Sequence, residues 1–202
     1  MDKGSRRIER GFFGRASHLV AADLIGMTLI SRRGPECGGR IVETEAYGDR
    51  SDLASHSAVY TKSRAHLLAA EPGTLYVYLS YGVHQCLNFV AHEPGGAGAV
   101  LIRALEPTIG LETLRQRRGV ANEKLLLAGP GRVAQGLAVS REDTGADLIG
   151  GAVLELLDTG ERPTIVATPR IGITRDVERL WRFVAADSPF VSRARVSSGA
   201  SI

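Results

Sequence analysis

Two glutamates stand two residues apart in the segment RIVETEAY, residues 40–47. The segment alternates like a β-strand, and strand side chains repeat every second residue, so Glu43, Glu45 and Tyr47 are expected on one face. Carboxylates inside a core strand cost free energy unless each has a partner or a chemical task. The spacing therefore predicts buried ion pairing, general acid–base chemistry, or both.

Aromatic residues gather just after these glutamates. The tyrosines are Tyr47, Tyr60, Tyr76, Tyr78 and Tyr81. His56 and His66 lie in the same window. Strand tyrosines are ordinarily core or rim residues. Their clustering next to a strand carboxylate and a long polar loop favours a ring-lined site.

The segment TLYVYLSYG, residues 74–82, is expected to be the first strand of a hairpin. Strand periodicity places Tyr76, Tyr78 and Ser80 on one face. Tyr81 stands beside Gly82, where the chain is expected to turn. A tyrosine at a hairpin tip is more exposed than a core tyrosine.

The remaining elements follow from hydrophobic periodicity and from glycine and proline positions. We expect helices at 15–25, 109–118, 121–127 and 129–139, and strands at 27–33, 38–47, 74–82, 83–91, 99–107, 152–158, 164–173 and 180–185. Residues 48–73 form a long polar loop, and loops of this length in compact domains are usually functional or disordered. The pattern predicts one α+β domain over residues 1–202, with a mostly antiparallel sheet and a flexible segment at 1–10.

The composition allows nucleic acid as a partner without demanding it. The net charge is +3, and the cationic residues are almost all arginine, which suits bidentate phosphate contacts. A coding bias or a thermal-stability trend would also explain this arginine content. The two cysteines lack CxxC spacing, so we expect reduced thiols and neither a disulfide nor a metal site.

No segment reads as a signal peptide or a membrane span. The longest apolar stretch, HLVAADLIGMTLI, is interrupted by Asp23 and Gly26 and is too short to cross a bilayer. We therefore expect a cytoplasmic, intracellular protein with no membrane partner.

Several ordered motifs together resemble the alkyladenine (3-methyladenine) DNA glycosylase family. They are RIVETEAY, SH at 55–56, PGTLYVYLSYG followed by Asn88, LIRALEP at 101–107, AGPGRVAQGLAV at 128–139 and SPFVS at 188–192. The resemblance covers the chain after about residue 10.

The resemblance implies a monofunctional glycosylase in base excision repair, without metal or cofactor. Such an enzyme flips alkylated or deaminated purines, of the 3-methyladenine, 7-methylguanine, hypoxanthine and ethenoadenine class, out of duplex DNA and hydrolyses the N-glycosidic bond. Glu45 then activates the attacking water. Arg103 orders that water or a phosphate, although a structural pair with Glu43 or Glu106 is a serious rival. Glu43 is interpreted as structural and paired with an arginine.

The resemblance also implies the base pocket. Tyr47 and His56 lie on one side of the flipped base and Tyr78 on the other, while Asn88 crowds the exocyclic amine of normal guanine. A positively charged methylpurine over a tyrosine face gains about 0.5–2 kcal/mol.

The hairpin of a curved antiparallel sheet is expected to insert into DNA. By resemblance, Tyr81 is the wedge that fills the gap left by the flipped nucleotide, and Leu101 lies near it and packs against DNA. The implied partner is double-stranded DNA, bound by a monomer associated with the nucleoid.

The loop before PGTLYVY departs from the family pattern. An Arg-Asn pair is replaced by Ser63 and Arg64, and a Met-Phe pair by Leu67 and Leu68. These changes leave the range of accepted lesions open.

Two other functions remain alternatives. A non-catalytic binder of damaged DNA would keep the wedge without using Glu45. A carbohydrate hydrolase would use both carboxylates, about 5–10 Å apart across a sugar.

Overall fold

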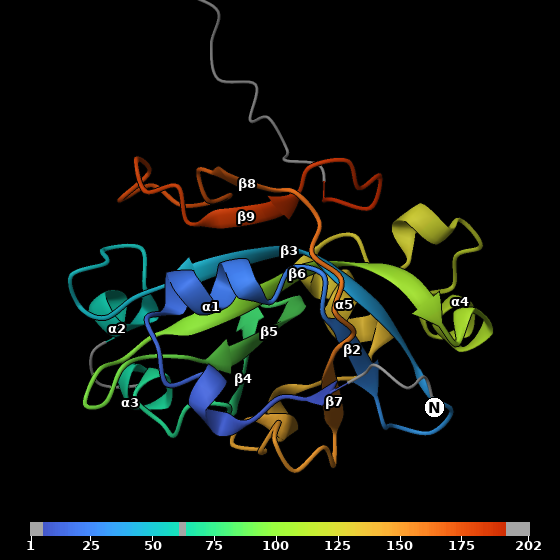
Figure 1. Cartoon of the computed structure of the whole chain (residues 1–202), viewed down its shortest axis with the longest axis horizontal. Helices are drawn as coiled ribbons and strands as arrows, with labels where there is room; N and C mark the ends of the chain where they lie inside the picture. Colours follow the sequence, from blue (N-terminus) through green and yellow to red (C-terminus); the bar gives the residue numbers. More distant parts are fainter. Residues whose placement is uncertain (1–5, 61–63, 193–202) are drawn as a thin grey trace, which may run out of the picture.

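The computed structural model describes residues 6–60 and 64–192. Within them nine strands form one curled, antiparallel sheet in the order β1-β7-β2-β3-β6-β5-β4, and β9 joins through β3 and carries β8 (Figure 1). The expected α+β class and antiparallel sheet are confirmed. That residues 1–202 form a single domain stays a prediction, because the described residues do not cover the whole chain.

The strands are β1 (Arg6–Arg7), β2 (Thr28–Ser31), β3 (Cys37–Tyr47), β4 (Leu75–Ser80), β5 (His84–Val90), β6 (Ala99–Ile109), β7 (Leu154–Asp158), β8 (Ile165–Thr168) and β9 (Arg182–Ala185). The helices are α1 (Ser17–Asp23), α2 (His56–Val59), α3 (Ala65–Leu68), α4 (Leu111–Arg118) and α5 (Pro130–Gly136), with short 3-10 turns η1 (Arg10–Phe12), η2 (Glu123–Leu125) and η3 (Arg141–Asp143).

The two long strands β3 and β6 pair at the centre of the sheet, and both contribute buried hydrophobic residues to the core. Helix α1 lies across them in Figure 1, and α5 packs against β5 and β6. Gly39 permits the close approach of these strands, because a Cβ there would lie 1.8 Å from the carbonyl oxygen of Glu106. Both strands are buried along most of their length, so the charged residues inside them, Glu43, Glu45 and Arg103, need partners.

The register between β3 and β6 shifts twice beside the glutamates. Glu43 pairs with Ala104, but the next residue, Thr44, pairs with Ile102, so Arg103 is an extra residue on β6. A bulge of this kind bends a strand and re-aims a side chain. Here it directs a cation toward two carboxylates, as described below.

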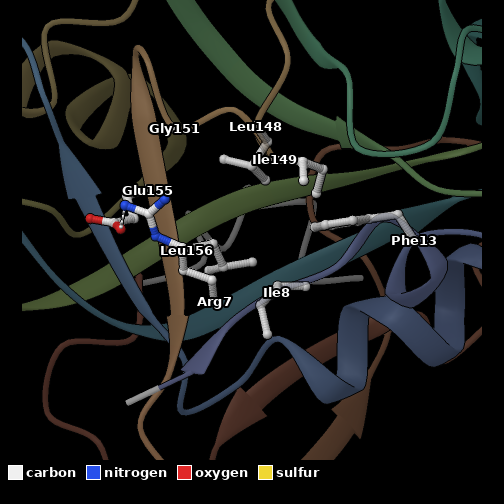
Figure 2. Close-up of a pocket in the computed structure, with 8 residues that line it drawn as sticks. All are labelled: Arg7, Ile8, Phe13, Leu148, Ile149, Gly151, Glu155 and Leu156. Atoms are coloured by element: carbon white, nitrogen blue, oxygen red, sulfur yellow. Dashed lines mark ion pairs between the residues drawn. The ribbon is translucent and has the colours of Figure 1, made fainter.

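Of the segment 1–10, which we expected to be flexible, the structure describes residues 6–10. Arg6 and Arg7 form β1 against β7, and Arg7 makes an ion pair of 2.9 Å with Glu155 (Figure 2). Ile8 and Phe13 line a cavity of about 10 Å³ beside this pair, room for a single water. These contacts join the segment to β7, and the flexibility of 1–10 stays a prediction.

Three expected elements are shorter or more structured than predicted. The strand expected at 164–173 ends at Thr168, because Pro169 cannot donate a ladder hydrogen bond. The helix expected at 121–127 is only the 3-10 turn η2. The polar loop 48–73 contains the short helices α2 and α3.

No helix in 6–60 or 64–192 has the length and apolarity needed to cross a membrane. The same residues contain no group of three His, Cys, Asp or Glu side chains placed to hold a metal ion. Cys37 and Cys86 are buried free thiols.

Candidate active site

Glu45 is a fully buried carboxylate at the end of β3. Its Oε1 accepts a hydrogen bond of 2.7 Å from the backbone N–H of Ile171. Its Oε2 accepts one of 2.9 Å from the Tyr47 hydroxyl and one of 3.2 Å from Arg103. Burial raises the pKa of Glu45 by more than these donors lower it. A carboxylate with a raised pKa is a better proton acceptor for general-base chemistry.

Glu43 is held in a different way, although it lies only two residues earlier. Its Oε1 accepts from Arg103 at 2.9 Å, from Arg182 at 2.7 Å and from the Ser192 hydroxyl at 2.9 Å, and its Oε2 accepts from the Ser192 N–H at 2.6 Å. Burial raises the pKa of Glu43, but the opposite effect of Arg103, Ser192 and Arg182 together is larger. The pKa of Glu43 is therefore lowered overall. The expected pairing of Glu43 with an arginine is confirmed, and its structural role stays a prediction.

Arg103 joins the two carboxylates. Its Nε donates to Glu43 and its Nη1 to Glu45, and the side chain is nearly buried. The expected rival pair with Glu106 does not form, because Arg40 is the partner of Glu106. The other rival, a structural pair with Glu43, does form, and it coexists with the contact to Glu45.

A second buried ion pair supports this arrangement from outside the strand. Arg170 donates to Asp52 at 2.7 and 2.8 Å and to the Ala46 carbonyl at 3.0 Å. Its guanidinium lies 4.8 Å from the centre of the Tyr47 ring. Sequence reasoning missed this pair, since Asp52 stood in an unpatterned loop and Arg170 in an expected strand.

A cavity of about 440 Å³ lies beside Glu45. Tyr47, His56, Tyr78, Tyr81 and Asn88 all line it, so the structure brings the expected pocket residues together. Glu45 itself does not line the cavity. The hydroxyl of Tyr47 is the group that connects this carboxylate to the cavity wall.

His56 packs directly against Tyr78. The two ring centres are 4.5 Å apart in a T-shaped contact, and His56 Nδ1 lies 2.8 Å from the Tyr76 hydroxyl. A base stacked between two rings needs them about 7 Å apart, twice the contact distance. The expected sandwich between His56 and Tyr78 is therefore closed in this structure, and a base could enter it only if one ring moved.

His56 is neutral at physiological pH. Burial, reinforced by the nearby charge of Arg64, lowers the pKa of His56 to about 4. Its ring therefore contributes no formal charge to the cavity.

Asn88 is fixed in the strand by its own amide group. Its side-chain nitrogen donates to the carbonyl oxygens of Tyr76 and Cys86, both at 3.1 Å. Both N–H groups are used, so the amide oxygen remains to meet a bound base. Asn88 thus satisfies backbone groups and lines the cavity at the same time.

Tyr81 stands at the tip of the β4–β5 hairpin with 90% of its surface exposed. Its φ is +49°, a conformation that costs energy in a residue with a side chain. Val83, two residues on, is also exposed.

Leu101 is buried, unlike Tyr81. It is 3% exposed inside β6, where it pairs with Asn88 on β5 and Glu45 on β3. The expectation that Leu101 packs against DNA stays a prediction, and the structure places this side chain in the buried part of the sheet.

Known proteins resemble the chain over nearly its whole length. The family model for methylpurine-DNA glycosylase (MPG) matches residues 11–189. A Rhizobium meliloti protein named "Putative 3-methyladenine DNA glycosylase" is 50% identical over 182 residues, covering 90% of this chain and 94% of the relative. A protein of the same name from Rhodopseudomonas palustris is 46% identical, covering 93% of this chain and 91% of the relative. Another, from Chlorobium luteolum, is 40% identical, covering 95% of this chain and 99% of the relative. The chain therefore belongs to the methylpurine-DNA glycosylase family.

Proposed function

We propose that this DNA glycosylase removes damaged purines from duplex DNA by hydrolysing the N-glycosidic bond, with Glu45 as the general base. The observation that carries the proposal is the placement of Glu45. It is a buried carboxylate with a raised pKa, bonded to a tyrosine in the wall of a ring-lined cavity. Groups with such perturbed pKa values in a concave site are candidates for catalysis.

The chemistry follows from the leaving group. Loss of the purine leaves positive charge on the sugar, which a nearby carboxylate stabilises while it takes a proton from the attacking water. Arg103 lowers the pKa of Glu45 against the effect of burial and holds the carboxylate in place. Because Glu45 has no exposed surface, water reaches it only when the Tyr47 hydroxyl moves or gives up its hydrogen bond.

Base flipping requires a wedge and a receiving cavity. Rotating a nucleotide out of the stack costs a few kcal/mol, and the cost is least where damage has weakened pairing. The exposed Tyr81 would fill the gap in the duplex, and the adjoining cavity would receive the base. Hypoxanthine and ethenoadenine are proposed as substrates alongside the methylpurines, acted on by a monomeric enzyme in the nucleoid.

The rival functions fit the geometry less well. A carbohydrate hydrolase would need Glu43 as a second working carboxyl, but three donor residues engage this side chain. A binder without activity would gain nothing from a buried carboxylate held in an unfavourable charge state. The alternatives therefore leave the difference between the two glutamates unexplained.

The test uses duplexes that carry 3-methyladenine, 7-methylguanine, hypoxanthine or ethenoadenine. Wild-type protein is expected to release the base from at least one of them, as seen by alkaline cleavage of the abasic site. Glu45→Gln should release none while binding the same duplex. Glu106→Gln, which removes a carboxylate paired with Arg40 away from the cavity, is the matched control and should keep activity. Release by Glu45→Gln at the wild-type rate would refute the assignment, and binding without release in all three proteins would favour the binder.

A further inference from the structure

We propose that Arg64 makes this cavity selective for neutral purine lesions with hydrogen-bond acceptors over positively charged methylpurines. The inference rests on the proposed function and concerns the same cavity. It assigns a specificity-determining role to a side chain in the stretch that departs from the family pattern. Ser63, the other residue of that replaced pair, lies outside the described residues.

Arg64 lies against Tyr78, one of the rings expected to receive the base, and against Tyr60. Its backbone N–H donates to the Tyr60 carbonyl at 3.1 Å. Its guanidinium carbon is 4.6 Å from the centre of the Tyr60 ring and 5.7 Å from that of Tyr78. Arg64 and both tyrosines line the cavity. A base entering over Tyr78 must therefore displace this guanidinium or lie beside it.

The charge of Arg64 is not balanced within the cavity wall. Among the described residues that line the cavity there is no carboxylate, and within 6–60 and 64–192 no carboxylate lies within ion-pair distance of Arg64. His56 adds no charge, as described above. The charged groups behind the wall are already bonded to one another, Glu45 to Arg103 and Asp52 to Arg170. A bound base therefore meets one net positive side chain.

This charge has opposite effects on the two classes of lesion. Purines methylated at N3 or N7 are cationic, so they are repelled by the guanidinium, and they compete with it for the same tyrosine faces. Hypoxanthine is neutral and presents O6 and N7, the acceptor pair that a guanidinium contacts in bidentate fashion. One positive charge a few Å from the base is expected to change the preference for neutral over cationic lesions by about tenfold or more.

The experiment compares wild type, Arg64→Met and Arg64→Lys on duplexes that carry 7-methylguanine or hypoxanthine. The readout is the ratio of kcat/KM for the two lesions. Arg64→Met is expected to raise the 7-methylguanine to hypoxanthine ratio about tenfold, since it removes the charge and keeps the length. Arg64→Lys keeps the charge but loses the planar donors, so its ratio should stay much closer to wild type while release of hypoxanthine slows.

The control is Lys124→Met, which removes one positive charge from the exposed turn η2, outside the cavity. Any loss of general attraction to DNA should affect both lesion duplexes equally and leave the ratio unchanged. A second readout is the ratio of binding affinities for the two lesion duplexes. It is measured with Glu45→Gln added to each protein, because this variant is expected to bind without releasing the base. If wild type releases neither base but Arg64→Met shifts the affinity ratio, the proposed function falls and the role of Arg64 stands. A ratio within twofold of wild type in both readouts would overturn the role of Arg64, whether or not the protein is active.

Discussion

Arg170 and Asp52 form a bidentate ion pair whose side chains are completely buried. The pair ties the polar loop after β3 to the segment after β8, 118 residues further along the chain. The next residue, Ile171, donates its backbone N–H to Glu45, and the guanidinium covers the Tyr47 ring. This contact therefore fixes two groups of the candidate site from a distant part of the chain.

Replacing one partner of this pair should destabilise the protein strongly. Asp52→Asn is expected to lower the free energy of unfolding by about 3–5 kcal/mol, because Arg170 would keep a buried, uncompensated charge. Urea unfolding followed by circular dichroism measures the loss. Asp23→Asn is the control, since its pair with Arg15 is half exposed and should contribute less than about 1 kcal/mol. Equal losses in the two variants would show that the buried pair contributes no special stability.

The two glutamates should respond differently to neutralisation at pH 7. Glu43→Gln is expected to cost about 3 kcal/mol or more of stability, because its donors stabilise the ionised form and lower its pKa. Glu45→Gln should cost less, since burial raises the pKa of Glu45 and the folded state holds its charge poorly. Urea unfolding ranks the two variants. A larger loss for Glu45→Gln would mean that Glu45 is the structural carboxylate.

The exposed wedge should be dispensable for folding. Tyr81→Gly is expected to keep or slightly raise the free energy of unfolding, because glycine tolerates the positive φ at this position. Base release should fall at least tenfold while salt-sensitive, non-specific duplex binding persists. Tyr81→Phe keeps the ring and should remain active. An unfolded Tyr81→Gly protein would show that the tyrosine supports the fold.

The neutral state of His56 predicts a pH dependence of stability. The unfolded chain binds a proton at this histidine near pH 6.5, whereas the folded protein does so only at about pH 4. Between these pH values protons bind the unfolded chain more readily and so favour unfolding. The stabilisation of the fold by the neutral ring is therefore complete above pH 6.5 and is lost as the pH falls toward 4. Unfolding free energies of wild type and His56→Gln, measured from pH 4 to 7, should converge toward acid pH. Parallel curves would contradict the lowered pKa.

The sequence by itself determined the features that depend on short-range pattern. Alternation in RIVETEAY predicted β3 and the shared side of Glu43 and Glu45, and both carboxylates do meet the same arginine. Gly82 predicted the turn of the hairpin and the exposure of Tyr81. Such features are readable because side-chain direction repeats every two residues along a strand and because glycine tolerates left-handed backbone.

Only the tertiary structure decided which glutamate is held by several donors and which lies behind the cavity wall. The difference arises from Arg182 and Ser192 on one side and from Ile171 on the other, all more than 120 residues away from their partners. The bulge that aims Arg103 and the burial that neutralises His56 likewise depend on neighbouring strands and loops. Burial and charge pairing are properties of the packed chain, so a pattern in one segment cannot fix them.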